Sequence, residues 1–374
     1  FPATRISSPR SIRAAIPTIK HLLNHGAKVI LASHLGRPGG KVQDGLRLRP
    51  VAERLTQLIG KNVSVTGDAL GLGTSDALKR LRPGELLLLE NLRFHAEEEK
   101  NDPKFAEQLA AYADIYVNDA FGTAHRAHAS TVGIATLLPA YAGFLMEQEI
   151  AQLSNLLESP ARPFAAIVGG AKVSGKLKVL DNLVSKVDIL VLGGGMANTF
   201  LLAQGKAIGK SLAEHDMVDE ASRVLAIAEQ QGVKVILPVD VIVAKEVTRG
   251  TEYKTLLADK IPASWHIVYI GKATLEIMEA ALAEARTVFW NGPLGVFEIP
   301  SFSHGTKDIA RFLAERCDAG AAVVVGGGDS VAAIQQQGLA SRFTHISTGG
   351  GASLEFLEGR DLPGVSILPD RGAA

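Results

Sequence analysis

The sequence predicts an α/β protein in which parallel sheets carry helices on both faces. Three observations support this fold class. Short apolar, β-branched segments recur along the chain, segments with helical periodicity separate them, and glycine-rich turns follow many of the apolar segments. Strands that are apolar throughout are typical of parallel sheets buried on both faces, and their alternation with helices is typical of a doubly wound fold.

Length and composition restrict the class of protein further. A chain of 374 residues is too long for one hydrophobic core to be the default, so two domains are expected. The formal net charge is +0, which gives no support to a general nucleic-acid or membrane-surface role. The single cysteine, Cys317, excludes a disulfide framework and suits a reducing compartment. No apolar run approaches the roughly 18 residues of a spanning helix.

The predicted strands fall into two groups. The first group comprises residues 27–33, 62–68, 85–92 and 114–119. The second comprises residues 164–170, 188–195, 234–241, 266–271, 286–292, 321–328 and 344–350. Helical periodicity separates them, for example over 104–113 and 217–232, and an amphipathic pattern over 11–26 predicts a helix before the first strand. A longer pattern over 143–163, near the midpoint, ends at prolines and predicts an interdomain helix.

Basic residues follow three of the four strands of the first group. Arg37 comes after the first, Arg93 after the third and Arg126 after the fourth, with His34 and His125 close by in sequence. Because ligands of doubly wound sheets bind beyond the carboxyl ends of the strands, these side chains are expected to converge on one anion. Arginine binds carboxylate and phosphate through paired hydrogen bonds. The pattern indicates a small ligand with more than one negative group, although either histidine is also compatible with a core position.

Glycine, with almost no basic residue, follows the strands of the second group. Such loops occupy 169–176, 193–200, 290–298, 326–330 and 347–353. Glycine lets backbone amides approach a ligand closely, and a helix that begins there favours phosphate. Together the loops predict a nucleotide pocket.

Two familiar nucleotide motifs are incomplete in this sequence. Gly170, Gly175 and Lys176 satisfy most of a P-loop pattern, but Leu177 has no hydroxyl for Mg²⁺. Residues 71–76 lack the third glycine of a dinucleotide fingerprint, so a dehydrogenase is a weaker alternative.

Two further features bear on the nucleotide pocket. The spacing of Lys172 and Lys176 predicts that they lie one helical turn apart and point at one site. Asp329 stands at a predicted helix start, where it either caps the helix or holds Mg²⁺ on a phosphate chain.

Seven long motifs now connect the sequence to a known family. HLGRP, LLLENLRF, VNDAFGTAHRAHAS, GGAKVSGK, WNGPLGVFE, GGGDS and STGGGASLE occur in this order. The chain resembles the phosphoglycerate kinases over essentially its whole length from about Ile12. The resemblance implies two Rossmann-like, doubly wound domains joined by a long interdomain helix. It also implies reversible phosphoryl transfer from 1,3-bisphosphoglycerate to ADP, which gives 3-phosphoglycerate and ATP and needs Mg²⁺.

The resemblance also implies domain bounds and roles for individual residues. It expects a triose-binding domain over 1–150, a nucleotide-binding domain over 151–355 and a tail over 356–374 that returns to the first domain. The triose ligands would be His34, Arg37, Arg93, His125 and Arg126. The nucleotide ligands would be Gly170, Ala171, Lys172, Lys176, Gly193, Gly194, Gly195, Gly271, Asn291, Pro293, Val296, Glu298, Gly326, Gly327, Gly328, Asp329 and Ser330. Lys172, Arg126, Gly327 and Gly350 would act in catalysis, and Asp329 would hold the metal.

The chain departs from the family pattern near its start. It has no counterpart of the family's R-x-D-x-N strand, and Ser11 occupies the position of a family arginine, with Arg10 and Arg5 as possible substitutes. We therefore expect a chain that begins at Phe1 to be an impaired kinase, and we expect Phe1 to lie inside a longer chain. Because this motif is absent, a kinase-like binding protein without activity is an alternative. The resemblance also implies a cytoplasmic monomer that acts on small molecules, without nucleic-acid or membrane partners.

Overall fold

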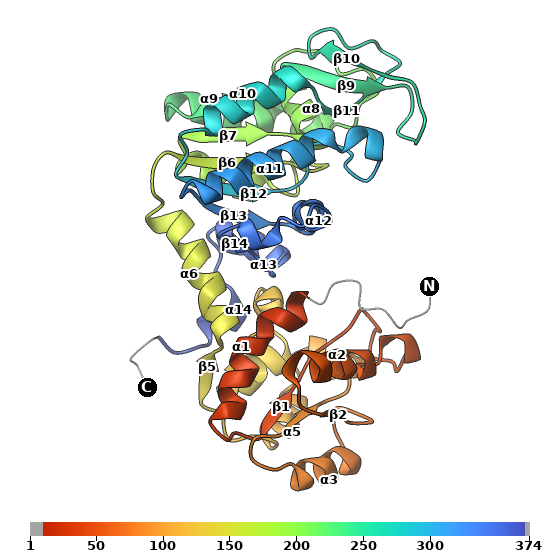
Figure 1. Cartoon of the computed structure of the whole chain (residues 1–374), viewed down its shortest axis with the longest axis vertical. Helices are drawn as coiled ribbons and strands as arrows, with labels where there is room; N and C mark the ends of the chain where they lie inside the picture. The colour runs from red at the N-terminus through yellow and green to blue at the C-terminus, as the bar shows by residue number, and fades with distance from the viewer. Residues whose placement is uncertain (1–9, 371–374) are drawn as a thin grey trace. The chain divides into compact units, whose positions relative to one another are not determined.

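The computed structural model describes residues 10–370 and divides the chain into two compact units (Figure 1). The first unit comprises the chain up to Ile150 together with the segment that starts at Asp361, and the second comprises Ala151–Arg360. Arg5 lies outside the described residues. Within residues 10–370, no helix is both long and apolar enough to cross a membrane.

The first unit contains two parallel sheets. Its helices and strands are α1 (Arg10–Asn24), β1 (Val29–Leu31), α2 (Arg49–Ile59), β2 (Val63–Val65), α3 (Leu72–Arg80), β3 (Leu86–Leu88), α4 (Ala96–Glu99), α5 (Pro103–Ala110), β4 (Tyr116–Asn118), β5 (Ala140–Ala142) and α14 (Pro363–Ser366). One sheet has the order β1-β3-β2, and β4 pairs with β5 in the other. The strand β5 was not predicted, because three residues after Pro139 are too few to show a strand period.

Burial of apolar side chains holds the first sheet against its helices. Ile19 and Leu23 of α1, Leu55 of α2 and Leu86 of β3 belong to one buried cluster. Full burial of such a side chain contributes about 1.5–3 kcal/mol. Gly60 caps the end of α2: its φ of 76° is left-handed, and its N–H bonds to Thr56 O. These contacts hold α1 and α2 against the first sheet.

The second unit is built on a six-stranded parallel sheet (Figure 1). Its order is β14-β13-β12-β6-β7-β8, with β6 (Phe164–Val168), β7 (Ile189–Leu192), β8 (Lys234–Ile236), β12 (Thr287–Asn291), β13 (Ala322–Gly326) and β14 (His345–Ile346). Its helices are α7 (Leu177–Val184), α8 (Gly194–Ala203), α9 (Val218–Gln230), α10 (Lys272–Leu282), α11 (His304–Asp318), α12 (Gly328–Gln336) and α13 (Gly351–Leu357). The α/β fold with parallel sheets agrees with the prediction.

The register places the last residues of three strands side by side. Asn291, at the end of the central strand β12, lies opposite Val168 of β6 and Gly326 of β13. The loops that follow these strands therefore begin at one edge of the sheet. This edge carries most of the glycine-rich segments that the sequence analysis selected.

The parallel strand predicted over 234–241 is confirmed only for its first residues, which form β8. The strand breaks around Pro238 into β8 and β9 (Asp240–Ala244), since proline cannot donate to a strand ladder. The strand β9 turns away from the parallel sheet and pairs antiparallel with β10 (Tyr253–Leu257) and β11 (His266–Ile270). The strand β10 was not predicted, because its largely exposed residues do not form an apolar run.

The long helix predicted over 143–163 is present as α6 (Phe144–Glu158), and the boundary between the units falls within it. Asp119, just after β4, accepts hydrogen bonds at Oδ1 from Leu145 N (2.9 Å) and Met146 N (3.2 Å). A carboxylate on the free amides of a first helical turn stabilises the helix start.

The end of the chain contacts the segment that follows β4. Gly364, in α14, donates its N–H to Ala124 O at 2.8 Å and accepts at its carbonyl from Asn118 Nδ2 at 3.0 Å.

Candidate active site

The loops after β1, β3 and β4 bring basic side chains together in the first unit. Arg93 lies in a short 3₁₀ turn, Leu92–Phe94, and its side chain is only 5% exposed. Its Nη1 donates to Gly36 O at 3.0 Å, and its Nε lies 3.3 Å from Glu99 Oε1. The guanidinium of Arg93 is thus held by the loop that carries His34 and Arg37.

Electrostatic coupling shows which other groups lie close to Arg93. Burial, and then the charges of Arg93, His128 and Arg126, lower the pKa of His34 to about 4. Burial lowers the pKa of His128 too, again helped by Arg93. His34 is therefore neutral near pH 7, because burial and the neighbouring positive charges both disfavour a second proton on its ring. We call His34, Arg37, Arg93, Arg126 and His128 the cationic cluster.

The segment after β4 supplies the other side of the cationic cluster. Arg126 donates from Nε to His125 Nε2 at 3.1 Å, so His125 orients the arginine. Arg37 is exposed, and its charge acts on Arg93. The structure thus brings the predicted residues of the three loops together. Arg10 belongs to α1, and no side-chain position is described for it.

Two acidic residues beside the cationic cluster were not predicted. Glu98 is 3% exposed and accepts hydrogen bonds from Ser130 N (3.0 Å) and Ser130 Oγ (2.5 Å). Its Oε1 lies 3.8 Å from His128 Nδ1, and burial raises the pKa of its carboxyl group. The sequence places Glu98 and Glu99 shortly after Arg93, which could have suggested that they lie near it. Nothing in the local sequence shows which of the two faces inward.

Lys176 organises the carboxyl edge of the sheet in the second unit. Its Nζ donates to Gly169 O at 2.6 Å, to Asn291 O at 3.0 Å and to Asn291 Oδ1. Burial lowers the pKa of Lys176 to about 8, and the nearby charge of Asp329 opposes this shift. Lys176 is consequently a cation whose charge is lost at moderately alkaline pH.

The glycine loops at this edge approach one another closely. A Cβ on Gly194, whose φ is +69°, would lie 2.6 Å from Gly170 O, so only glycine fits there. The amide Nδ2 of Asn291 lies beside Gly326 and Gly327 and is buried. Within residues 10–370 this Nδ2 has no hydrogen-bond partner, which leaves a donor available beside the loop.

Helix starts complete this edge. The helix α8 begins at Gly194, next to Gly193 and Gly195, and α12 begins at Gly328, so both point amide groups toward the loops. Asp329 lies in the first turn of α12 and is exposed. In the described part of the chain its side chain accepts no hydrogen bond, and Gly327 is the cap residue, so the capping alternative receives no support.

Ser330 has a structural contact that the sequence did not reveal. Its hydroxyl is fully buried and accepts from Gly292 N at 2.6 Å, which ties α12 to the loop after β12.

Lys172 and Lys176 do not lie on a helix, so the predicted helical spacing is wrong. The helix α7 begins at Leu177, after both residues. Lys172 lies in an exposed loop, where its charge acts on Glu214. The glycine at 175 and the backbone turn around it delay the helix start.

The remaining predicted residues lie at several places in the second unit. Ala171 precedes Lys172 in the same loop, and its carbonyl would lie 2.9 Å from a Cβ on Gly195. Gly271 is packed against the Asp240 carboxylate after β11. Pro293, Val296 and Glu298 lie in the segment after β12, with Val296 N bonded to Val268 O at 2.9 Å and Glu298 exposed. Gly350 precedes α13 and accepts from Ser353 Oγ at 2.9 Å.

The fold, the cationic cluster of the first unit and the glycine-lined edge of the second unit define a class of protein. A parallel-sheet unit that gathers cations and a second unit that gathers backbone amides and glycine are suited to phosphorylated ligands. A sequence model of the family described as phosphoglycerate kinase matches residues 2–360. The chain therefore belongs to the phosphoglycerate kinase family. It is a kinase that transfers a phosphoryl group between phosphoglycerate and adenine nucleotide in glycolysis.

Similar proteins agree with this assignment. The phosphoglycerate kinase of Moorella thermoacetica is 55% identical over 99% of this chain and 93% of its own length. The structure of the Coxiella burnetii enzyme matches with a TM-score of 0.86 and 41% identity, over 97% of this chain and 92% of that one. The enzyme from Pyrococcus horikoshii matches with a TM-score of 0.84 and 35% identity, over 98% and 93%. The P-loop, dehydrogenase and inactive alternatives are set aside by these relationships.

Proposed function

We propose that the cationic cluster of the first unit binds phosphoglycerate and that the glycine-lined edge of the second unit binds the nucleotide. The observation that supports this most strongly is the convergence of Arg93, Arg126 and His34, where burial and then the neighbouring positive charges lower the pKa of His34 to about 4. Such crowding is unfavourable without an anion, and a triose that carries phosphate and carboxylate supplies two negative groups. His125 would act through its bond to Arg126.

On the nucleotide side, the phosphates would meet the amides at the starts of α8 and α12. Lys176 would supply a positive charge, and the free Nδ2 of Asn291 would donate to the ligand. Phosphoryl transfer needs positioning and charge neutralisation more than covalent chemistry. We assign this neutralisation to Lys172 and Arg126 and to the backbone amides at Gly327 and Gly350.

The metal is part of the proposal. Within residues 10–370 no group of three or more His, Cys, Asp or Glu side chains could hold a metal by itself. Mg²⁺ commonly uses one or two carboxylates together with nucleotide phosphates, and the exposed, unbonded carboxylate of Asp329 fits that requirement. Bound there, Mg²⁺ would neutralise phosphate charge. The family resemblance also favours a monomer that acts in the cytoplasm on small molecules.

Calorimetry on the variant Arg126→Ala tests the division into two sites. We expect the affinity for 3-phosphoglycerate to fall at least about tenfold, because charged hydrogen bonds contribute about 1.5–3 kcal/mol each. The affinity for ADP should stay within about twofold of the original. Lys178→Ala, an exposed change in α7, serves as a control for loss of a surface charge. Equal losses for both ligands in the Arg126 variant would contradict the proposed division.

A further inference from the structure

We propose that Asn91 is a positioning residue for phosphoglycerate, which it does not touch itself. Its side-chain amide joins the loop that carries His34 and Arg37 to the turn that carries Arg93. This inference rests on the proposed function of the cationic cluster. It adds a residue that determines the spacing of the ligand-binding groups.

The amide of Asn91 is fully buried and completely bonded. Its Nδ2 donates to Leu35 O at 2.8 Å and to Leu46 O at 2.9 Å. Its Oδ1 accepts from Leu35 N at 3.3 Å and from Arg93 N at 3.1 Å. Both donors and both acceptor directions of an asparagine amide are therefore in use.

These bonds hold the two ends of one loop. Leu35 stands next to His34, and Leu46 lies at the far end of the same loop, before α2. Asn91 also bonds to the backbone of Arg93 and so fixes the start of the 3₁₀ turn. The bond from Arg93 Nη1 to Gly36 O, at 3.0 Å, is a second connection between the turn and the loop. A shift of the loop would consequently move the guanidinium as well.

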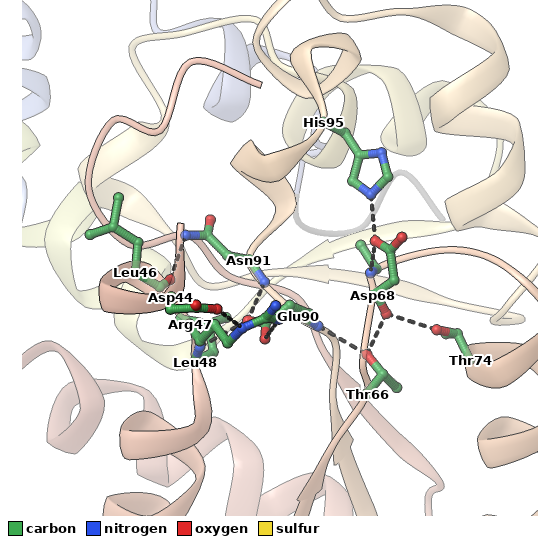
Figure 2. A network of polar contacts seen from close by, with 11 residues as sticks. Asp44, Leu46, Arg47, Leu48, Thr66, Asp68, Thr74, Glu90, Asn91 and His95 are labelled. Atoms are coloured by element: carbon green, nitrogen blue, oxygen red, sulfur yellow. Dashed lines mark hydrogen bonds and ion pairs between the residues drawn. The ribbon is translucent and has the colours of Figure 1, made fainter. Parts of the chain in front are cut away.

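A buried carboxylate fixes Asn91 in turn (Figure 2). Glu90 Oε1 accepts from Asn91 N and from Leu48 N, both at 2.8 Å, and Glu90 Oε2 lies 3.3 Å from Arg47 Nη1. The backbone N–H of Glu90 donates to Thr66 Oγ1 at 3.0 Å, and Thr66 in turn donates to Asp68 O at 2.5 Å.

Figure 2 shows how this network continues on the other side to His95, which lies 2.6 Å from Asp68 Oδ1. The loops after β1, β2 and β3 are thus connected by side chains rather than by the sheet alone. Buried networks that are fully satisfied hold one geometry, because any shift leaves a polar group without a partner.

The effect of losing Asn91 can be separated from a general loss of stability. The variant Asn91→Ser replaces one uncharged polar side chain with another, but the short serine hydroxyl cannot reach both Leu35 O and Leu46 O. The loop is then free to move, and binding must order it again. We expect the affinity for 3-phosphoglycerate to fall about tenfold, which is roughly the net contribution of one hydrogen bond. ADP affinity should be unchanged.

A second variant disturbs the same loop at Gly36. Gly36 has a φ of +69°, and a Cβ there would lie 2.8 Å from Leu46 Cδ2. Because Gly36 is exposed, Gly36→Ala leaves the core of the unit intact. A residue with a side chain is strained in this conformation, so we expect a loss of about fivefold in 3-phosphoglycerate affinity, again without effect on ADP.

The experiment compares both variants with a core control by calorimetry, together with thermal unfolding. The control is Leu23→Ala in α1, which is 4% exposed and belongs to a cluster that does not contain Asn91. It should lower the melting temperature and keep 3-phosphoglycerate affinity within about twofold. The inference fails if Asn91→Ser and Gly36→Ala both bind 3-phosphoglycerate normally, or if Leu23→Ala loses as much affinity as they do.

A further variant separates this inference from the proposed function. Arg93→Ala removes a proposed ligand directly. If Arg93→Ala binds 3-phosphoglycerate normally, the assignment of the cationic cluster is wrong. If Arg93→Ala loses affinity while Asn91→Ser and Gly36→Ala do not, the cluster is correct and only the positioning role of Asn91 is wrong.

Discussion

The affinity for ADP should fall as the pH rises through about 8, because Lys176 loses its proton there. Burial lowers the pKa of Lys176 to about 8, so the side chain is mostly charged at pH 7 and mostly neutral at pH 9. The second pKa of a phosphate group is about 6, so the charge of the nucleotide is nearly constant in this range. The sign is therefore unambiguous: only the protein loses an attractive charge.

The magnitude follows from the protonated fraction. With a pKa of about 8, that fraction falls from about nine-tenths at pH 7 to about one-tenth at pH 9. If only the ammonium form binds the phosphates well, the dissociation constant should rise about tenfold, or about 1.4 kcal/mol. Binding should also raise the pKa and take up about half a proton at pH 8.

Calorimetry at several pH values and fixed Mg²⁺ measures both quantities, with two buffers of different ionisation enthalpy for the proton count. Lys176→Met has no charge at any pH, so its affinity should be independent of pH and should meet the original curve at alkaline pH. Lys178→Met, an exposed change two residues away, should keep the original pH dependence. A flat curve for the unchanged protein, or the same slope in Lys176→Met, would refute the reasoning.

Two further predictions concern single carboxylates. Asp329→Asn should lower turnover with Mg-nucleotide at least about tenfold, because it removes the carboxylate proposed to hold Mg²⁺. Thermal stability should be unchanged, because the Asp329 side chain accepts no hydrogen bond within the described residues and Asn caps a helix about as well as Asp. Near-normal turnover would exclude the metal role. Asp119→Ala should lower the free energy of unfolding by about 1–2 kcal/mol in urea titrations, because Asp119 Oδ1 bonds two amides at the start of α6. Asp119→Asn should retain most of that stability, and an equal loss in both variants would show that the oxygen acceptor is not the cause.

The sequence carries the chemistry of each strand end. Arg37, Arg93 and Arg126 follow strands of the first unit, while the loops at 193–195 and 326–328 follow strands of the second. Because the carboxyl ends of parallel strands lie at one edge of their sheet, residues far apart in sequence can be grouped from the sequence alone. The long helix α6 was also predictable, since its pattern continues without interruption to the prolines.

Local patterns failed in segments that are irregular, short or exposed. The pair Lys172 and Lys176 has helical spacing, but the turn at 172–176 delays the helix until Leu177. The strand β10 is too exposed, and β5 too short, to show a period. In these places the pairing partner decides the conformation, and the partner lies elsewhere in the chain.

By itself, the sequence determined the α/β class, the basic and glycine-rich strand ends and, through its motifs, the family. Only the tertiary structure showed that Asn91 holds a loop more than forty positions away, through bonds to Leu35 and Leu46 separated from it by 56 and 45 residues. The same holds for Glu98 beneath His128 and for the contact of Lys176 with Asn291. Such bonds depend on the orientation and burial of the side chains, which are set only when distant loops pack together. No spacing along the chain therefore predicts them.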